Sequence, residues 1–235
     1  NPTSGEFAAN GAPVSFTAVY TTNPSGPTTG LGLRMLFDST QLTFVNLTNV
    51  FATSKVAEDL VPVATTSVRT DYRPRTEGLF AKITHHHAAG SDYWEVRTKD
   101  GLTSIHGTPQ RAGDDPAAIA DPARRSNVFA WHLSEARDVF GNRVVYEYER
   151  DLRQEGAHVS DQLYLSRIRY IDYTDSGGAT RFLAAVELHY EDRPDPFSSC
   201  RSGFEIRTTR RCTRIETRTQ DQLVRVYHLE YLDQR

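Results

Sequence analysis

The first fifth of the chain alternates apolar and polar residues in three short runs. Apolar residues take every second position from Val14 to Tyr20 and from Leu31 to Phe37, and the pattern resumes at Leu42 and Phe44. Because successive side chains of a strand point to opposite faces, this alternation predicts half-buried antiparallel strands. Three strands are too few to close a two-sheet core, so residues 1–52 are predicted to form a partial β-sandwich-like segment.

The alternation weakens after this segment. Ser54 to Thr70 has little period-two order and contains Val61-Pro-Val, so residues 53–71 are interpreted as a junction. The chain lacks an initiating Met and stops just after the apolar run from Leu223 to Leu232. We therefore expect it to be a fragment of a longer polypeptide.

Residues 72–235 contain repeated short apolar runs separated by turn residues, which predict a meander of antiparallel strands. The predicted strands are Gly78 to Thr84, Tyr93 to Arg97, Leu102 to His106, Val128 to Leu133, Arg143 to Tyr148, Leu163 to Tyr173, Arg181 to Tyr190, Phe204 to Arg214 and Leu223 to Tyr231. Gly107 to Asn127, rich in Ala, Asp and Pro, is predicted to be an exposed, mobile loop. The predicted fold class is all-β, built from antiparallel meander sheets.

The later runs predict a sheet with one apolar and one polar face. Phe182, Ala184, Val186, Leu188 and Tyr190 fall on one side of their strand, and Arg181, Glu187 and His189 fall on the other. A sheet that is dry on one face and wet on the other is suited to forming a wall.

Composition supports a soluble β-rich chain. Hydrophobic residues make up 38% and charged residues 24%, with 11 Tyr and 11 Phe against one Met. A formal net charge of −3 gives no field that would recruit nucleic acid, and no apolar run is long enough to span a membrane as a helix.

One motif combines turn and strand chemistry. It consists of Asp138, Gly141, Asn142, Val144, Tyr146 and Tyr148. Gly and Asn tolerate positive φ, and the following Val-x-Tyr-x-Tyr predicts a strand with an aromatic ladder. The motif is thus interpreted as the start of a β-hairpin.

This motif resembles the Rhs or YD repeats of large bacterial toxin shells. Further likeness is carried by Asp59-Leu-Val-Pro62, Tyr72 to Ile83, Tyr93 to Gly101, Trp131-His-Leu133, Tyr164 to Tyr170, Tyr190 to Asp195 and Cys200 to Phe204. From about residue 58 to 235 the chain resembles the Salmonella virulence plasmid B family, which includes the B subunits of insecticidal toxin complexes. Residues 1–52 instead resemble extracellular bacterial sandwich modules of the cohesin type.

The resemblance implies a structural function rather than an enzyme. In this family the B-type and C-type chains form a hollow β shell that encloses a cytotoxic cargo and docks on a pore-forming A subunit. The implied partners are the rest of the same polypeptide, the cargo-bearing C-type subunit and the A-type subunit, without nucleic acid or direct membrane insertion. The implied location is extracellular within the toxin complex, or the bacterial cytoplasm before release.

Two other functions compete with this interpretation. Some family members carry a C-terminal ADP-ribosyltransferase with a Glu-x-Glu pair, and Glu147 and Glu149 have that spacing. The pair lies inside the predicted hairpin, where outward acids are expected on a solvated face. An adhesion or carbohydrate-binding module is the other alternative, favoured by the sandwich-like start and by Tyr93 and Trp94 as exposed aromatics.

Three further groups were weighed as sites. His85, His87 and His106 could bind a divalent metal, although consecutive histidines point in different directions, and no cofactor is predicted. Cys200 and Cys212 could form a disulfide or remain free. A cluster of arginines near the C-terminal end has two interpretations, a basic stripe for a partner or a solvated strand face. Its members are Arg207, Arg210, Arg211, Arg214 and Arg218.

Overall fold

The structure, a computed structural model, describes residues 59–76, 80–88, 90–109 and 114–231. Regular structure in these ranges is entirely β, and all the strand pairs are antiparallel, which confirms the predicted fold class. The predicted partial sandwich of residues 1–52 lies outside the described residues. No helix able to span a membrane was found in the part of the chain that is described.

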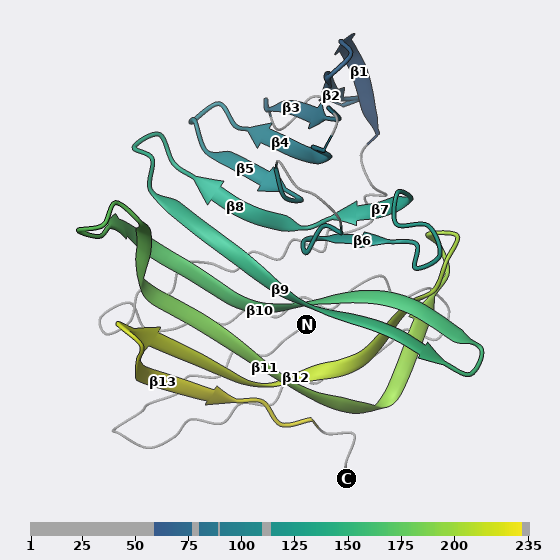
Figure 1. The fold of residues 1–235 in the computed structure, drawn as a ribbon, viewed down its shortest axis with the longest axis vertical. Helices are drawn as coiled ribbons and strands as arrows, with labels where there is room; N and C mark the ends of the chain where they lie inside the picture. The colour runs from purple at the N-terminus through teal and green to yellow at the C-terminus, as the bar shows by residue number, and fades with distance from the viewer. Residues whose placement is uncertain (1–58, 77–79, 89, 110–113, 232–235) are drawn as a thin grey trace, which may run out of the picture. The chain divides into compact units, whose positions relative to one another are not determined.

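Eleven strands form one sheet in which neighbours in sequence are neighbours in space, apart from one insertion (Figure 1). The strands of this sheet are β1 Leu60–Thr65, β2 Arg69–Pro74, β3 Lys82–His86, β4 Tyr93–Arg97, β5 Thr103–His106, β8 Leu133–Arg137, β9 Arg143–Glu155, β10 His158–Thr174, β11 Thr180–Ser199, β12 Ile206–Thr219 and β13 Gln222–His228. The insertion is a two-stranded sheet formed by β6 Ala118–Ala120 and β7 Val128–Trp131.

The described part of the predicted junction is folded into the sheet. β1 pairs with β2, with a register shift between Pro62 and Ala64. Proline lacks a backbone donor, so it is tolerated on an edge strand such as β1. The weak alternation on which the junction prediction depends did not reveal this strand, because Pro62 and the shifted register hide the pattern.

The predicted strand from Val128 to Leu133 is two strands in different sheets. β7 ends at Trp131 and pairs with β6, whereas β8 begins at Leu133 and pairs with β5 and β9. His132 is the residue between them. Its backbone N–H donates to Ala117 O at 2.6 Å, and its carbonyl accepts from Gly107 N at 2.8 Å. The chain therefore passes from the two-stranded sheet to the large sheet at His132.

The predicted exposed loop contains some of the most buried residues of the chain. Within Gly107 to Asn127, Ala117 to Ala120 are each at most 5% exposed. β6 packs against β10 of the large sheet. The loop prediction was therefore wrong for this stretch, because its small apolar side chains pack closely against the sheet. We call the described segment from Asp114 to Trp131 the flap.

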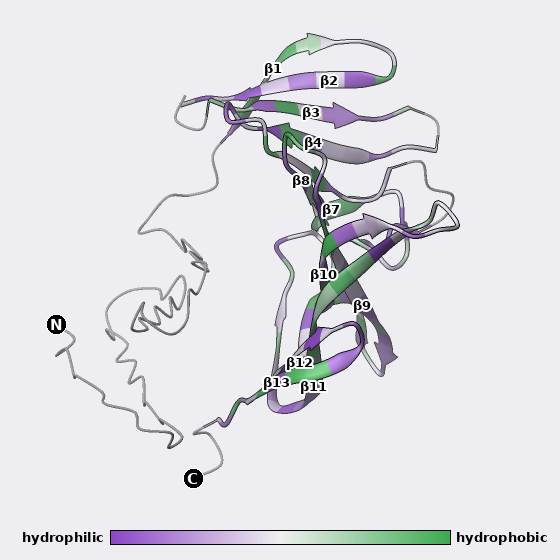
Figure 2. Ribbon diagram, turned by 90° about the vertical axis from the view of Figure 1, so that its left-hand side faces the viewer, coloured by the Kyte–Doolittle hydropathy of each residue, from purple (hydrophilic) through white to green (hydrophobic). Residues whose placement is uncertain are grey.

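Buried side chains in the described residues are polar as often as apolar. The buried apolar residues are Ala81, Ile83, Ala117, Ala118, Ile119, Ala120, Leu163, Tyr164 and Ala184. The buried polar or charged residues are Thr70, Thr84, Asp151, Ser160, Asp161, Thr209, Arg211 and Glu216. Hydrophilic and hydrophobic segments also intermingle along the strands in Figure 2. The long strands are therefore held by ion pairs as well as by apolar packing.

A β-bulge in β12 lies opposite the end of the apolar run of β11. The step from His189 to Tyr190 in β11 is matched by two steps in β12, from Arg214 to Cys212, so the extra residue is Thr213. The bulge therefore interrupts the alternation of β12, while that of β11 continues through Tyr190. Tyr190 packs beside Tyr164 of β10, with 5.1 Å between ring centroids.

Candidate functional site

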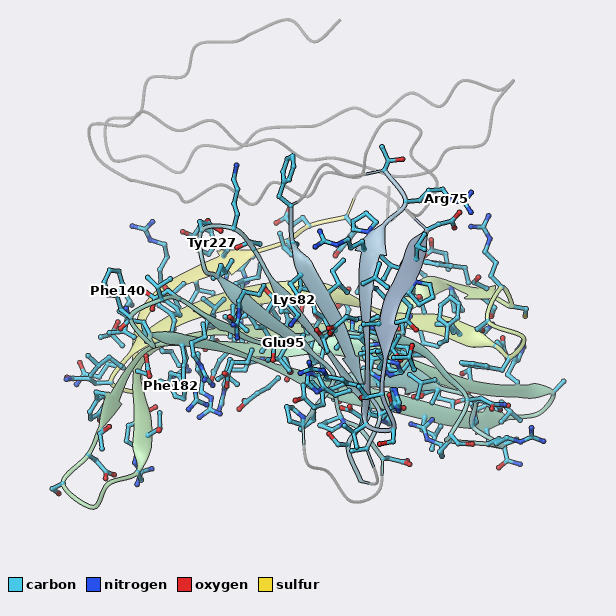
Figure 3. All side chains as sticks on the ribbon, turned by 90° about the horizontal axis from the view of Figure 1, so that it is seen from above. Arg75, Lys82, Glu95, Phe140, Phe182 and Tyr227 are labelled. Carbon is cyan, nitrogen blue, oxygen red and sulfur yellow. The ribbon has the colours of Figure 1, made fainter. Side chains whose placement is uncertain are left out.

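The long strands carry a row of charged side chains across one face. Cross-strand pairing aligns Glu147 of β9 with Arg167 of β10, Arg167 with Glu187 of β11, and Glu187 with Glu216 of β12. Residues directly opposite on antiparallel strands share a face and lie close enough to interact. The register therefore places these four residues in one line. Figure 3 shows the dense layer of side chains that the strands carry.

Arginines neutralise the carboxylates of this row. Arg167 Nη2 lies 2.6 Å from Glu187 Oε1, and Arg218 Nε lies 2.9 Å from Glu187 Oε2. Arg218 also reaches Glu216 Oε2 at 2.7 Å, and Arg214 Nε reaches Glu216 Oε1 at 2.9 Å. The hydrogen bond from Arg218 holds the pKa of Glu216 below its ordinary value. Arg218 thus bridges two like charges that would otherwise repel each other across the strands.

The same row contains a group with the spacing of metal ligands. Ligand atoms of Glu187, His189 and Glu216 lie within 4.8 Å of one another. All four carboxylate oxygens, however, already lie within 3 Å of a guanidinium nitrogen of Arg167, Arg214 or Arg218. A divalent cation would have to displace three fixed positive charges, so the arrangement favours an ion-pair network over a metal centre.

Each of the candidate metal-ligating histidines His85 and His87 has a partner of its own, although their two rings lie 5.5 Å apart. The His85 ring stacks on Trp94 at 4.3 Å, and its Nε2 lies 2.8 Å from Asp92 Oδ1. His87 Nε2 lies 3.2 Å from Thr70 Oγ1. His106 is on β5, where burial lowers the pKa of its ring. The structure does not gather His85, His87 and His106 into one ligand set.

Both acids of the Glu147 and Glu149 pair have arginine partners. The two share a strand face, as their spacing predicts, but Glu147 is paired with Arg169 and Glu149 Oε1 lies 2.5 Å from Arg210 Nη1. Arg210 in turn stacks over Tyr164 at 5.8 Å. The pair belongs to the ion-pair network.

The arginine stripe of β12 is similarly partnered. The contacts of its five arginines are Arg207 with Ser198 at 2.9 Å, Arg210 with Glu149, Arg211 with Glu191 at 2.8 Å, Arg214 with Glu216 and Arg218 with Glu187. These pairs favour a neutralised strand face over a basic stripe for a polyanion. Both cysteines are free: Cys200 is exposed, and Cys212 is half-buried with its pKa raised by burial.

Asp138 organises the turn of the Asp138–Tyr148 motif. Its Oδ1 accepts hydrogen bonds from the N–H groups of Phe140 and Asn142, both at 2.9 Å, and its Oδ2 accepts from Asn142 Nδ2 at 2.7 Å. The Asn142 contact lowers the pKa of Asp138. Gly141 takes φ +90°, whereas Asn142 is not among the positive-φ residues. The turn therefore needs left-handed backbone at Gly141.

The strand half of the motif packs against aliphatic residues. Tyr146 lies opposite Ile168, and Tyr148 lies opposite Leu165. Tyr148 also donates its hydroxyl to Leu133 O at 2.7 Å, and burial raises its pKa to about 12. The two tyrosines thus bind β9 to both of its neighbours.

Tyr93 and Trp94 do not form an exposed aromatic platform. Both are half-buried. Tyr93 stacks on His86 with ring centroids 4.4 Å apart, and Trp94 has His85 on one face. The expectation of exposed rings was wrong because the histidines of β3 cover them.

A buried anchor, not singled out in the sequence, fastens the flap to the large sheet. Asp161 of β10 has a fully buried side chain, and its two oxygens lie 2.6 and 2.5 Å from Arg150 Nη1 of β9. Asp161 Oδ2 also accepts from Arg125 Nη1 at 2.7 Å and from Ala120 N at 3.0 Å. One carboxylate therefore joins two strands of the sheet to the flap.

Arg150 completes this anchor from the other side. Its Nη2 donates to Ala118 O at 2.7 Å and to the carbonyl of Asp115. The Asp115 side chain accepts from Thr108 N at 2.7 Å and from Ala117 N at 2.8 Å. Local sequence gives little sign of the anchor, because Arg150 and Asp161 look like ordinary polar positions of a strand.

Comparisons with known proteins bear on the same region. The family model of the Salmonella virulence plasmid 65kDa B protein matches residues 44–191 and 170–216. The chain belongs to this family. The mono(ADP-ribosyl)transferase SpvB of Salmonella typhimurium is 24% identical over 184 residues, covering 62% of this chain and 30% of SpvB. The chain thus spans about a third of the length of the relatives it matches.

Solved structures share the fold of this virulence plasmid B family member. The N-terminal domain of the effector SpvB from Salmonella typhimurium gives a TM-score of 0.57 at 22% identity, over 68% of this chain and 67% of that domain. The Photorhabdus luminescens Tc holotoxin pore gives 0.59 at 20% identity, over 75% of this chain and 11% of that chain. The likeness to SpvB falls on its N-terminal domain, not on its ADP-ribosyltransferase part. The chain is related to virulence toxins and toxin complexes.

Proposed function

We propose that this chain is a non-catalytic wall segment of a bacterial toxin complex, part of the β shell that encloses and helps deliver a cytotoxic cargo. The observation that carries the proposal is a single eleven-stranded meander whose charged face is filled by ion pairs and whose two edge strands are exposed. Such a sheet can act as a barrier that contains a cargo. The charged groups described above pair with one another and are not gathered around a substrate cleft.

The domain division and partners belong to the same proposal. Residues 1–52 are proposed as a separate segment, 53–71 as the link and 72–235 as the family region, with β1 extending the sheet into the link. The proposed partners are the rest of the toxin polypeptide, a cargo-bearing C-type subunit and an A-type pore subunit, outside the bacterium. Their support is the shared fold with the TcdB2-TccC3 crystal structure, with a TM-score of 0.52.

The edge strand β13 provides a test of the wall role. Three of its seven residues have exposed apolar side chains, namely Leu223, Val224 and Tyr227, and Val224 is 65% exposed. Unpaired edge strands bind other strands, so the 235-residue chain on its own is expected to self-associate at micromolar concentration. Val224→Lys should weaken this association by about tenfold, because a charged side chain on an edge opposes strand addition.

The control for this test is Val139→Lys. Val139 is 63% exposed but lies in the turn between β8 and β9, away from the sheet edges. Light scattering after size-exclusion chromatography would measure both variants. A wild-type chain that stays monomeric and melts cooperatively would contradict the wall role, as would equal effects of the two substitutions.

The non-catalytic part of the proposal has its own test. The paired Glu147 and Glu149 predict no NAD turnover by the 235-residue chain, measured as nicotinamide release in the presence of candidate protein acceptors. Glu149→Gln should leave the background rate unchanged. Turnover that disappears in Glu149→Gln would instead establish the enzymatic alternative.

A further inference from the structure

The flap is attached to the large sheet at one connecting residue and at one buried charge cluster. The connecting residue is His132, whose backbone bonds to Ala117 and Gly107. The charge cluster is the anchor formed by Arg150, Asp161 and Arg125. His132 and Arg150 are therefore the places where a local change in charge would act on the whole flap.

One ring nitrogen of His132 has no acceptor to balance a proton. Its Nε2 is buried and has no hydrogen-bond partner among the described residues. Its ring lies 5.2 Å from that of Tyr148, whose hydroxyl is already bonded to Leu133. A second proton on the ring would place an unpaired positive charge in a poorly solvated position, which proteins disfavour strongly.

The charged groups around the ring add to this effect. Arg150 of β9 and His106 of β5 both act on His132 as like charges. The nearby carboxylates are Asp161 of β10, which is occupied by Arg150, Arg125 and Ala120, and Asp115 of the flap, which is occupied by Thr108 and Ala117. A protonated His132 is thus repelled by Arg150 and His106, and these two carboxylates already have other partners.

We propose that the flap is an acid-released latch, in which protonation of His132 repels Arg150 and loosens the anchor on Asp161. Opening would uncover the contact surface between β6 and β10. The wall role and this latch rest on different observations, edge strands in one case and a buried histidine in the other, so either can fail alone.

The sign of the pH dependence follows from burial. Burial holds the pKa values of His132 and His106 below their ordinary value of 6.5. The unfolded or opened segment therefore binds protons more readily than the closed one, and closure is favoured above about pH 6.5 and weakened as the pH falls from there through the lowered values. Once the pH lies below those values, further acid has no additional effect through these groups.

Amide hydrogen exchange of the 235-residue chain tests the latch. The reporters are the N–H groups of Ala120 and His132, which bond to Asp161 and Ala117, and the references are Val186 and Leu188 in the central strand β11. Between about pH 7.5 and pH 5, after correction for intrinsic exchange, protection at the reporters should fall about tenfold more than at the references. An equal fall at all four amides would overturn the latch.

Substitutions separate His132 from general acid effects. His132→Asn should abolish the extra loss of protection at Ala120, whereas His228→Asn on the exposed edge strand β13 should retain it. If His132→Asn does not fold, an NMR titration of the wild-type imidazole gives the same decision. A His132 ring that titrates at or above 6.5 would overturn the proposal, and one that stays neutral below pH 6 would support it.

Discussion

Asp161→Asn is expected to lower the free energy of unfolding by about 3 to 5 kcal/mol, the usual cost of breaking a buried ion pair by removing one partner. The side chain keeps its shape but loses its charge, so Arg150 loses its carboxylate partner and Arg125 keeps only Asp114, 3.0 Å from its Nε. The Asp161 side chain is 0% exposed, and solvent cannot screen the two guanidiniums well. Urea unfolding at neutral pH, followed by circular dichroism in dilute protein, would measure the change.

The matched control is Asp59→Asn. Asp59 lies 3.6 Å from Arg75, and its side chain is 70% exposed. Exposed ion pairs contribute about 0 to 1 kcal/mol, so this substitution should have almost no effect on the urea midpoint. If Asp161→Asn cost no more than Asp59→Asn, the anchor would not be what fastens the flap.

Among the described residues, the longest alternating runs predicted where strands lie. The predicted runs Arg143 to Tyr148, Leu163 to Tyr173 and Arg181 to Tyr190 lie within β9, β10 and β11. Each strand continues beyond the predicted run. In β9, for example, the continuation contains Asp151 and Arg153, whose side chains are paired at 2.7 Å. A strand segment that is stabilised by ion pairs lacks the apolar alternation on which the prediction depends.

The anchor could not be predicted because it depends on register. Arg150 meets Asp161 only after β9 and β10 are aligned, and that alignment includes a shift between Leu165 and Arg167. Local periodicity does not encode which residues face each other across strands. The flap was missed for the same reason: Ala117 to Ala120 is buried by contacts with β10 and by carbonyls that bond to Arg150, not by an amphipathic pattern of its own.

The turn chemistry was more accessible to sequence reasoning. Asp138 and Gly141 have short-range roles, since an Asp side chain caps the amides two and four residues later and Gly accepts positive φ. Local rules therefore located the hairpin. They did not locate the bulge at Thr213, because an extra residue in one strand is defined only against its partner.

Gly107→Ala is expected to destabilise the chain by about 2 to 5 kcal/mol, the sum of about 1 to 2 for a left-handed non-glycine backbone and about 1 to 3 for overpacking. Gly107 has φ +81° and is buried where the chain leaves β5. A Cβ there would lie 2.6 Å from Trp131 Cδ1 and 3.0 Å from Asp115 Oδ2. Both neighbours belong to the flap, so relief of the clash requires moving it.

Gly178→Ala separates the two contributions. Gly178 has nearly the same backbone, φ +80°, but a Cβ there would have no heavy atom within 4 Å. It should show the backbone cost alone, and the difference between the two variants in urea unfolding should equal the packing cost at the flap. Because Gly107 N also bonds to His132 O, the Gly107 variant should in addition speed amide exchange at Ala120. Equal losses of stability in the two variants would mean that the flap can move away from the added methyl group at no cost in free energy. Asp161 and Arg150 would then hold a loosely packed segment.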